Sequence, residues 1–214
     1  MPRTPTNESV AAQALRDGDT EVIGSWVRNA LPAVVPERLA APVVRHPLEF
    51  ICLPLHRSGK VGLCLHVWPE NDDTTSPVIH AHSWDLWSYV VCGTVQNQIV
   101  SIHDEADTPD YGLYTVTSTT GGVDEVQATG RLVTCVPRQR KDVRSGQIYR
   151  LPAGLFHRSG HRGMTATLVL GEQHEGRENL ILGPLNGYPW HDSRREECSP
   201  DEARELLRRV VMRC

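Results

Sequence analysis

The feature that most constrains this chain is a series of short strand-like runs between residues 48 and 183. The runs are four to nine residues long, are rich in β-branched and aromatic side chains, and are bounded by turn residues. They lie at residues 48–55, 61–68, 86–93, 94–102, 113–119, 131–137, 147–152, 166–171 and 179–182. Their number and spacing predict an antiparallel sandwich or barrel.

Both ends of the chain have a helical pattern instead. Apolar residues recur at helical spacing within residues 7–45, where glycine and prolines divide them into two or three short helices. Near the other end, Ser199 and Glu202 form a capping box with Pro200 in the first turn, which predicts a terminal helix. We therefore expect an N-terminal helical segment, a barrel and a C-terminal helix, at residues 1–45, 46–190 and 191–214.

Two polar stretches interrupt the strand-like region. Residues 104–130 contain glycines and few large apolar side chains, which is typical of a long hairpin excursion. The charged run at residues 138–144 is more typical of a solvated loop than of a binding site for anions.

Length and charge narrow the class of protein. A chain of 214 residues is long enough for one well-buried core and needs no second domain. A net charge of −4 provides no basic surface for nucleic acid, and no apolar run approaches the ~20 residues of a membrane span. Without a signal peptide, we expect a cytoplasmic monomer or homodimer that acts on a small molecule.

The six cysteines also favour a reducing compartment such as the cytoplasm. They are widely spaced and include no C-x-x-C pair, so they predict neither a zinc ribbon nor a disulfide framework. Four of them, Cys52, Cys64, Cys92 and Cys135, fall within strand-like runs, as buried free thiols would.

Two histidine-containing segments carry the chemistry. His80 and His82 are separated by one residue, so on a strand both imidazoles point to the same face. His157 follows the turn sequence Pro152-Ala153-Gly154, where it could complete the site. Three neutral imidazoles at about 2.0–2.2 Å from a divalent ion would leave positions open for substrate and oxygen. The pattern predicts a metal enzyme.

These segments resemble the two motifs of the cupin superfamily, in the same order. Residues 80–93 keep the H-x-H and the closing glycine, and residues 146–157 keep the second motif nearly complete. The resemblance implies a mainly β cupin jelly-roll, a double-stranded β-helix barrel that holds one metal. Many cupins have a glutamate ligand where this chain has Leu86, so the resemblance implies a three-histidine site. Asp85 has the wrong strand parity for a ligand.

Residues 48–102 and 146–170 are also similar to the cysteine dioxygenase-like thiol dioxygenases, which are three-histidine cupins. That likeness implies Fe(II), with Zn, Ni or Mn as alternatives, because imidazole binds all of these ions. It also implies oxygen and a small anionic chelating substrate, such as a thiol or an amino acid. Arg57 is the arginine nearest to where this family has its substrate-carboxylate clamp.

Further candidates lie close to these motifs. His66 shares a strand face with Cys64 and could line the cavity or be a satisfied core histidine. His161 could orient His157 through a hydrogen bond. An inward guanidinium from Arg150 or Arg158 could hold a substrate carboxylate. The remaining candidates for the pocket wall or for contacts to the ligands are Trp87, Tyr89 and His103.

The expected function is that of a 2-oxoglutarate-independent Fe(II) dioxygenase with ligands His80, His82 and His157. Two alternatives stay open: a metal-dependent isomerase, lyase or hydrolase with Zn, Ni or Mn, and a cupin that binds a small molecule without turnover. A site of two histidines and one carboxylate would need His103-Asp104-Glu105, which no turn motif accompanies.

Overall fold

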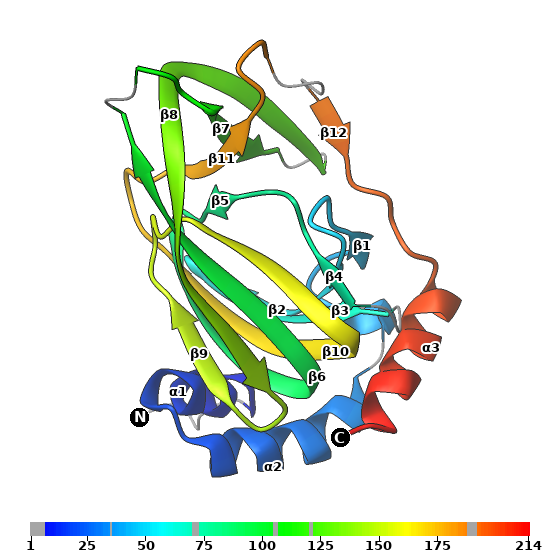
Figure 1. The fold of residues 1–214 in the computed structure, drawn as a ribbon. Helices are drawn as coiled ribbons and strands as arrows, with labels where there is room; N and C mark the ends of the chain where they lie inside the picture. The colour runs from blue at the N-terminus through cyan, green and yellow to red at the C-terminus, as the bar shows by residue number, and fades with distance from the viewer. Residues whose placement is uncertain (1–6, 35, 70–72, 105–106, 120–121, 188–191) are drawn as a thin grey trace.

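The computed structural model describes residues 7–34, 36–69, 73–104, 107–119, 122–187 and 192–214, which form one large antiparallel sheet with helices against its outside (Figure 1). The strands are β1 (Val44–Arg45), β2 (Ile51–Ser58), β3 (Val61–Trp68), β4 (Asp73–Thr75), β5 (His80–Ala81), β6 (Trp84–His103), β7 (Tyr111–Ser118), β8 (Val123–Arg144), β9 (Ile148–Leu151), β10 (His157–Gln173), β11 (Asn179–Gly183) and β12 (Asp192–Arg194). This mainly β fold confirms the predicted fold class.

The sheet closes on itself. Its strands follow the order β1-β2-β3-β10-β5-β11-β7-β8-β6-β9, and β10 pairs with β6 as well. That additional pairing joins the two ends of the path from β10 through β5, β11, β7 and β8 to β6. A closed antiparallel circuit of this kind is consistent with a jelly-roll barrel, and it encloses a space that side chains from several strands can line.

The alternating side chains of β3 show which face of the sheet packs against the helices and which face lines the cavity. Leu63, Leu65 and Val67 belong to the apolar core that the sheet shares with the helices. The residues between them, Cys64 and His66, line the cavity on the other face. Because successive side chains point to opposite faces, one short strand serves both the packing and the site.

The helices cover the outer face, and local side chains cap α2 and α3. They are α1 (Asn7–Asp17), α2 (Thr20–Ala30) and α3 (Pro200–Val211), with 3₁₀ turns at Leu31–Ala33 and Pro36–Arg38. Asp19 caps α2 by accepting from the backbone N–H groups of Glu21 and Val22. The capping box at Ser199 is confirmed at the start of α3. Among the described residues, no helix is long and apolar enough to cross a membrane.

One glycine explains why two predicted strands are a single strand. The runs at 86–93 and 94–102 are continuous in β6, where Gly93 has a φ of +77°. A Cβ on Gly93 would lie 2.6 Å from the carbonyl oxygen of Met164. The pairing with β10 shifts register at this point, so Gly93 allows a bulge instead of a turn.

Two other expectations differ from the structure. The charged residues 138–144 are not a loop; they belong to β8, whose backbone pairs with β6 while most of these side chains are exposed. Two short strands, β1 and β12, lie outside the range 46–190 expected for the barrel. Strands of two or three residues are too short for alternation to reveal them.

Candidate metal centre

The three predicted histidines meet at one place. His157 is the first residue of β10, and its Cα is the pairing partner of His80 in β5. The ring centroids of His80 and His157 are 4.3 Å apart, and the ring of His82 lies 4.8 Å from that of His80 and 5.2 Å from that of His157. One ligand atom of each histidine lies within 4.8 Å of the other two. We call these residues the histidine cluster; it could hold a metal ion.

Backbone carbonyls set the ring orientation of two of these histidines. The Nδ1 atom of His80 lies 3.2 Å from the carbonyl oxygen of Val78, and that of His157 lies 2.9 Å from the carbonyl oxygen of Leu155. A carbonyl only accepts, so each Nδ1 carries the proton. Each Nε2 then keeps its lone pair for a metal, as in metal-binding histidines whose other nitrogen donates to a fixed acceptor.

Burial keeps these imidazoles neutral. The pKa of His80 is lowered to about 3 by burial and by neighbouring His157, against the raising effect of the Val78 carbonyl. The pKa of His157 is lowered to about 4 by burial, despite the Leu155 carbonyl. Burial, His80 and His157 also lower the pKa of His82. All three side chains are therefore in the neutral form that a metal ion requires.

The turn before His157 is attached to the H-x-H segment. The backbone N–H of Gly154 donates to the carbonyl of His82 at 2.8 Å, and the N–H of Ala153 donates to the Asp85 carboxylate at 2.7 Å. Arg150 pairs with the other oxygen of Asp85 at 2.7 Å. Although burial opposes it, the Ala153 N–H and Arg150 lower the pKa of Asp85. Asp85 thus holds the turn in place and is not a ligand, as its parity predicted.

The donor set fits a divalent transition ion with open coordination positions. Leu86 lines the cavity, and its side chain has no donor atom that could ligate. Asp124 is the only carboxylate among the described residues that line the cavity, and Arg195 pairs with it at 2.9 Å. Three neutral nitrogens would therefore leave the full charge of the ion facing the cavity.

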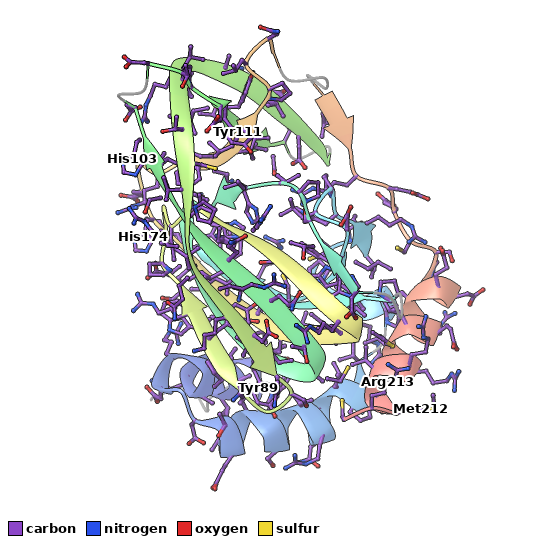
Figure 2. The ribbon with its side chains drawn as sticks, viewed as in Figure 1. Tyr89, His103, Tyr111, His174, Met212 and Arg213 are labelled. Carbon is purple, nitrogen blue, oxygen red and sulfur yellow. The ribbon has the colours of Figure 1, made fainter. Side chains whose placement is uncertain are left out.

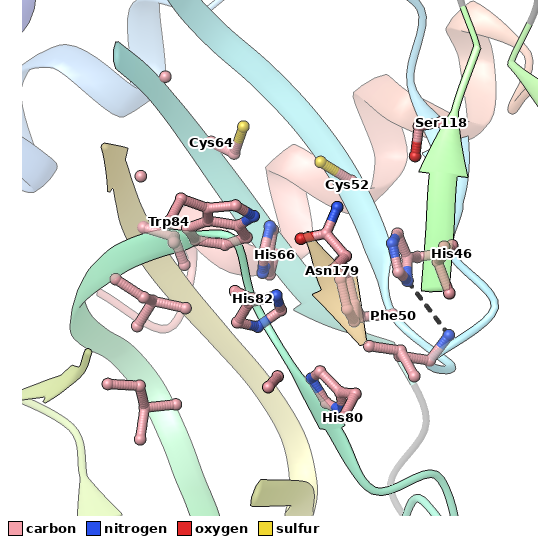
Figure 3. A pocket seen from close by; sticks show the side chains of 18 of the residues that line it. His46, Phe50, Cys52, Cys64, His66, His80, His82, Trp84, Ser118 and Asn179 are labelled. Atoms are coloured by element: carbon pink, nitrogen blue, oxygen red, sulfur yellow. Dashed lines mark hydrogen bonds between the residues drawn. The ribbon is translucent and has the colours of Figure 1, made fainter. Parts of the chain in front are cut away.

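The histidine cluster opens into a cavity of about 420 Å³ (Figure 3). This volume is within the usual range for small-molecule sites. Trp84 forms part of the wall and stacks on the ring of His82, with the ring centroids 4.2 Å apart. A Cβ on Gly171 would lie 2.9 Å from Trp84, so the absence of a side chain at Gly171 leaves room for the indole in this position.

A stack of three rings forms another part of the wall. The rings of His46 and Phe50 are 4.4 Å apart and nearly parallel, and Phe50 lies 4.1 Å from His66. Glu49, between His46 and Phe50, has a φ of +69°. The backbone N–H of Leu48 donates to His46 Nδ1 at 3.2 Å, so the neutral ring carries its proton on Nε2. Burial, and then Arg195, lower the pKa of His46.

Polar side chains also line this cavity. Asn179 accepts from the backbone N–H of Ser83 through Oδ1 at 2.9 Å, which leaves its two amide N–H groups for another acceptor. Arg57 and Lys60 line the cavity with exposed side chains. These donors and cations suit an anionic occupant.

A second group of donors lies in the same wall. Cys52 on β2 and Cys64 and His66 on β3 have ligand atoms within 4.8 Å of one another. Figure 3 shows these side chains in the wall of the cavity that His82 and Trp84 also line. Contact between the two thiols, followed by burial, raises the pKa of Cys52, whereas the contact with Cys52 lowers that of Cys64. All six cysteines are free thiols.

The structure corrects several of the site predictions. Trp87 and Tyr89 do not line the cavity; they pack with the core residues of the helices on the opposite face of β6. Figure 2 shows Tyr89 beside the helices. Their odd positions put them opposite Trp84 and Leu86, because strand side chains alternate. His103 is exposed at the end of β6, away from the cavity (Figure 2). Glu105, in the alternative with His103, lies outside the described residues.

The two arginines and His161 are also placed elsewhere. Arg150 lies over the outer-facing Trp87 at 4.9 Å, and Arg158 donates to Gln98 at 2.7 Å in a separate small pocket. His161 bonds to the Gly163 carbonyl at 3.0 Å, whereas Leu155 accepts from His157. By contrast, His66 does line the cavity.

The cavity residues that were not anticipated include His46, Phe50, Asn179 and Arg195. They come from three separate segments, at residues 46–50, 179 and 195, that only the tertiary structure joins. Phe50 lies in a strand-like run, and its alternation with Cys52 was the one available signal.

Comparisons with known proteins find similarity to solved structures alone. No protein-family model matches the chain, and no curated protein matches it in sequence. A cupin superfamily protein from Desulfitobacterium hafniense is similar over 58% of this chain and 78% of its own, at 12% identity and a TM-score of 0.35.

Two further solved structures are similar at the same level. A putative mannose-6-phosphate isomerase from Ralstonia eutropha matches 68% of this chain and 97% of its own, at 20% identity and a TM-score of 0.36. A variant of oxalate decarboxylase from Bacillus subtilis matches 63% of this chain and 28% of its own, at 13% identity and a TM-score of 0.38.

Proposed function

We propose that this protein is a metal-dependent cupin dioxygenase in which His80, His82 and His157 hold Fe(II). The observation that carries the proposal is a cluster of three neutral imidazoles with no carboxylate among them, at the wall of a cavity of about 420 Å³. When bound, the ion would supply the redox chemistry with oxygen that no side chain in this cavity can supply.

The substrate we propose is a small anionic chelator such as a thiol or an amino acid. A +2 charge on three neutral ligands attracts an anion more strongly than a centre with a carboxylate ligand. The Nε2–H of His46 and the amide of Asn179 provide donors that could orient its polar groups. The indole of Trp84 and the ring of Phe50 exclude water from the wall.

Oxygen stoichiometry tests the proposal. Protein purified without oxygen and loaded with Fe(II) should consume about one O₂ per substrate from a panel of thiols and amino acids, without 2-oxoglutarate. Labelled O₂ should leave both atoms in the product. His157→Ala is the matched inactive control.

Other outcomes favour the alternatives. Undiminished anaerobic turnover, or equal activity with Zn, Ni or Mn, would reject the dioxygenase and favour isomerase, lyase or hydrolase chemistry. Tight binding of a panel compound without turnover under either condition would favour a cupin that only binds its ligand.

A further inference from the structure

The wall of this cavity contains a second convergent set of donor atoms. The Cα atoms of Cys52 and His66 are pairing partners across β2 and β3, and Cys64 lies two residues from His66 on the same strand. A spacing of two puts all three side chains on one face of the hairpin. Their ligand atoms lie within 4.8 Å of one another, the same limit that the histidine cluster meets.

We propose that Cys52, Cys64 and His66 form a second metal site that binds Zn²⁺ through two thiolates and one imidazole. We call these residues the sulfur cluster. Zinc binds thiolate sulfur at about 2.3 Å and imidazole nitrogen at about 2.0–2.1 Å, and two cysteines with one histidine are a known set of protein ligands for zinc with an open fourth position. Hard cations such as Ca²⁺ and Mg²⁺ prefer oxygen ligands and do not suit it.

The surroundings are arranged for such a site. Cys52 is buried, and Phe50 stacks on His66 at 4.1 Å, which restrains the imidazole ring. All three donors line the cavity, so the fourth position of the ion faces the same space as the histidine cluster. Two paired strands supply the ligands, and a paired hairpin holds them more rigidly than a loop would.

Charge balance allows both sites in one cavity. Two thiolates neutralise the charge of Zn²⁺, so the loaded sulfur cluster is neutral as a whole. A neutral complex does not repel the +2 charge of an ion on the histidine cluster, whereas two unneutralised ions would repel each other strongly in a partly buried cavity. Binding releases the two thiol protons to solvent and oxidises nothing, so no other reactant is needed.

Cobalt(II) is the probe that distinguishes the sites, because cobalt–thiolate bonds give a charge-transfer absorption that cobalt–imidazole bonds do not. Metal-free protein should bind two equivalents of Co²⁺ and develop this absorption, and Zn²⁺ should abolish it. The double variant Cys52→Ser with Cys64→Ser should bind one equivalent and lack the band. Cys92→Ser, a buried cysteine on the helix-facing side, should keep it.

Alkylation tests the same site without a variant. Added Zn²⁺ should protect Cys52 and Cys64 of the unchanged protein from a thiol reagent, as read by peptide mass, while the other cysteines react as before. Absence of the thiolate band in the unchanged protein, its survival in the double variant, or lack of protection at these two residues would overturn the proposal. None of these readouts depends on dioxygenase activity.

Discussion

The histidine cluster and the sulfur cluster lie in one cavity wall, yet they are built in opposite ways. The histidine cluster joins residues 80 and 157, far apart in the chain, and local motifs mark each part. The sulfur cluster lies within one hairpin of consecutive strands, β2 and β3, and no motif marks it. Closeness in sequence therefore does not make a site easier to predict; a motif does, because it reports a local geometry that the chemistry needs.

The clusters also differ in their supports. The Val78 and Leu155 carbonyls hold two rings of the histidine cluster, and the Gly154–His82 hydrogen bond joins its segments. In the sulfur cluster, Phe50 restrains His66 by stacking. Changes to one support network should therefore leave the other cluster intact.

Removal of a ligand should have the largest effect. His157→Ala should weaken binding at the histidine cluster by more than the roughly 10- to 100-fold that loss of a supporting group costs. The cobalt–thiolate band of the sulfur cluster should persist. Elemental analysis and absorption measure the two sites separately, and circular dichroism monitors the fold. His103→Ala, outside the cavity, is the control. Stoichiometric metal retained at the histidine cluster would remove His157 from the ligand set.

Acid should destabilise the metal-free protein through the histidine cluster. In the unfolded chain, histidines take up protons near pH 6.5, whereas in the fold His80 does so only near pH 3 and His157 near pH 4. The unfolded state then binds more protons, so the free energy of unfolding should fall as pH drops from about 6.5 to 4, by about 1.4 kcal/mol per pH unit for each histidine.

Denaturant titrations across this pH range measure that slope. His157→Ala should lower this slope by the contribution of about one histidine. The Cys52→Ser, Cys64→Ser variant should keep the full slope. An unchanged slope in His157→Ala would mean that this imidazole is not held neutral by burial.

A methyl group against Trp84 should have the next largest effect on the histidine cluster. In Gly171→Ala the new Cβ would lie 2.9 Å from the indole, which would have to shift from the position in which it stacks on His82. We expect binding there to weaken by roughly 10-fold, within the range for outer contacts of metal ligands. Isothermal titration with metal measures it.

Gly62 provides a matched control, because it is the cross-strand partner of Gly171 and a Cβ there would meet only a backbone oxygen at 4.0 Å. Gly62→Ala should bind normally. Equal effects of the two substitutions would mean that Trp84 does not position His82.

Loss of the Asp85 carboxylate should have the smallest effect on metal binding. Asp85→Ala leaves the Ala153 N–H without its charged acceptor, which should lower the free energy of unfolding by about 1–2 kcal/mol. Binding at the histidine cluster should weaken only a few-fold, because the Gly154–His82 hydrogen bond remains. Asp104→Ala, which removes an exposed ion pair with Arg131, is the control. A loss as large as that of His157→Ala would make Asp85 a ligand.

Much of the fold was predictable because strand and helix patterns are local. Strand-like runs bounded by turn residues predicted β2, β3, β7, β9 and β11, and the capping box predicted the start of α3. The prediction was wrong for residues 138–144, because backbone pairing with β6 holds a charged segment in a strand despite its exposed side chains. A strand end was predicted at Gly93 because amino-acid composition does not distinguish a glycine in a bulge from a glycine in a turn.

The sequence alone determined the three histidines that meet at the histidine cluster and the absence of a glutamate at Leu86, because H-x-H parity and a Pro-x-Gly turn act within a few residues. Only the tertiary structure decided that Trp84 and not Trp87 faces the histidine cluster, that His46 and Asn179 join the cavity, and that Cys52 lies opposite His66. The physical reason is that these placements depend on the register between strands and on the closure of β6 against β10, which are set by packing across the whole barrel and leave no local pattern in the chain.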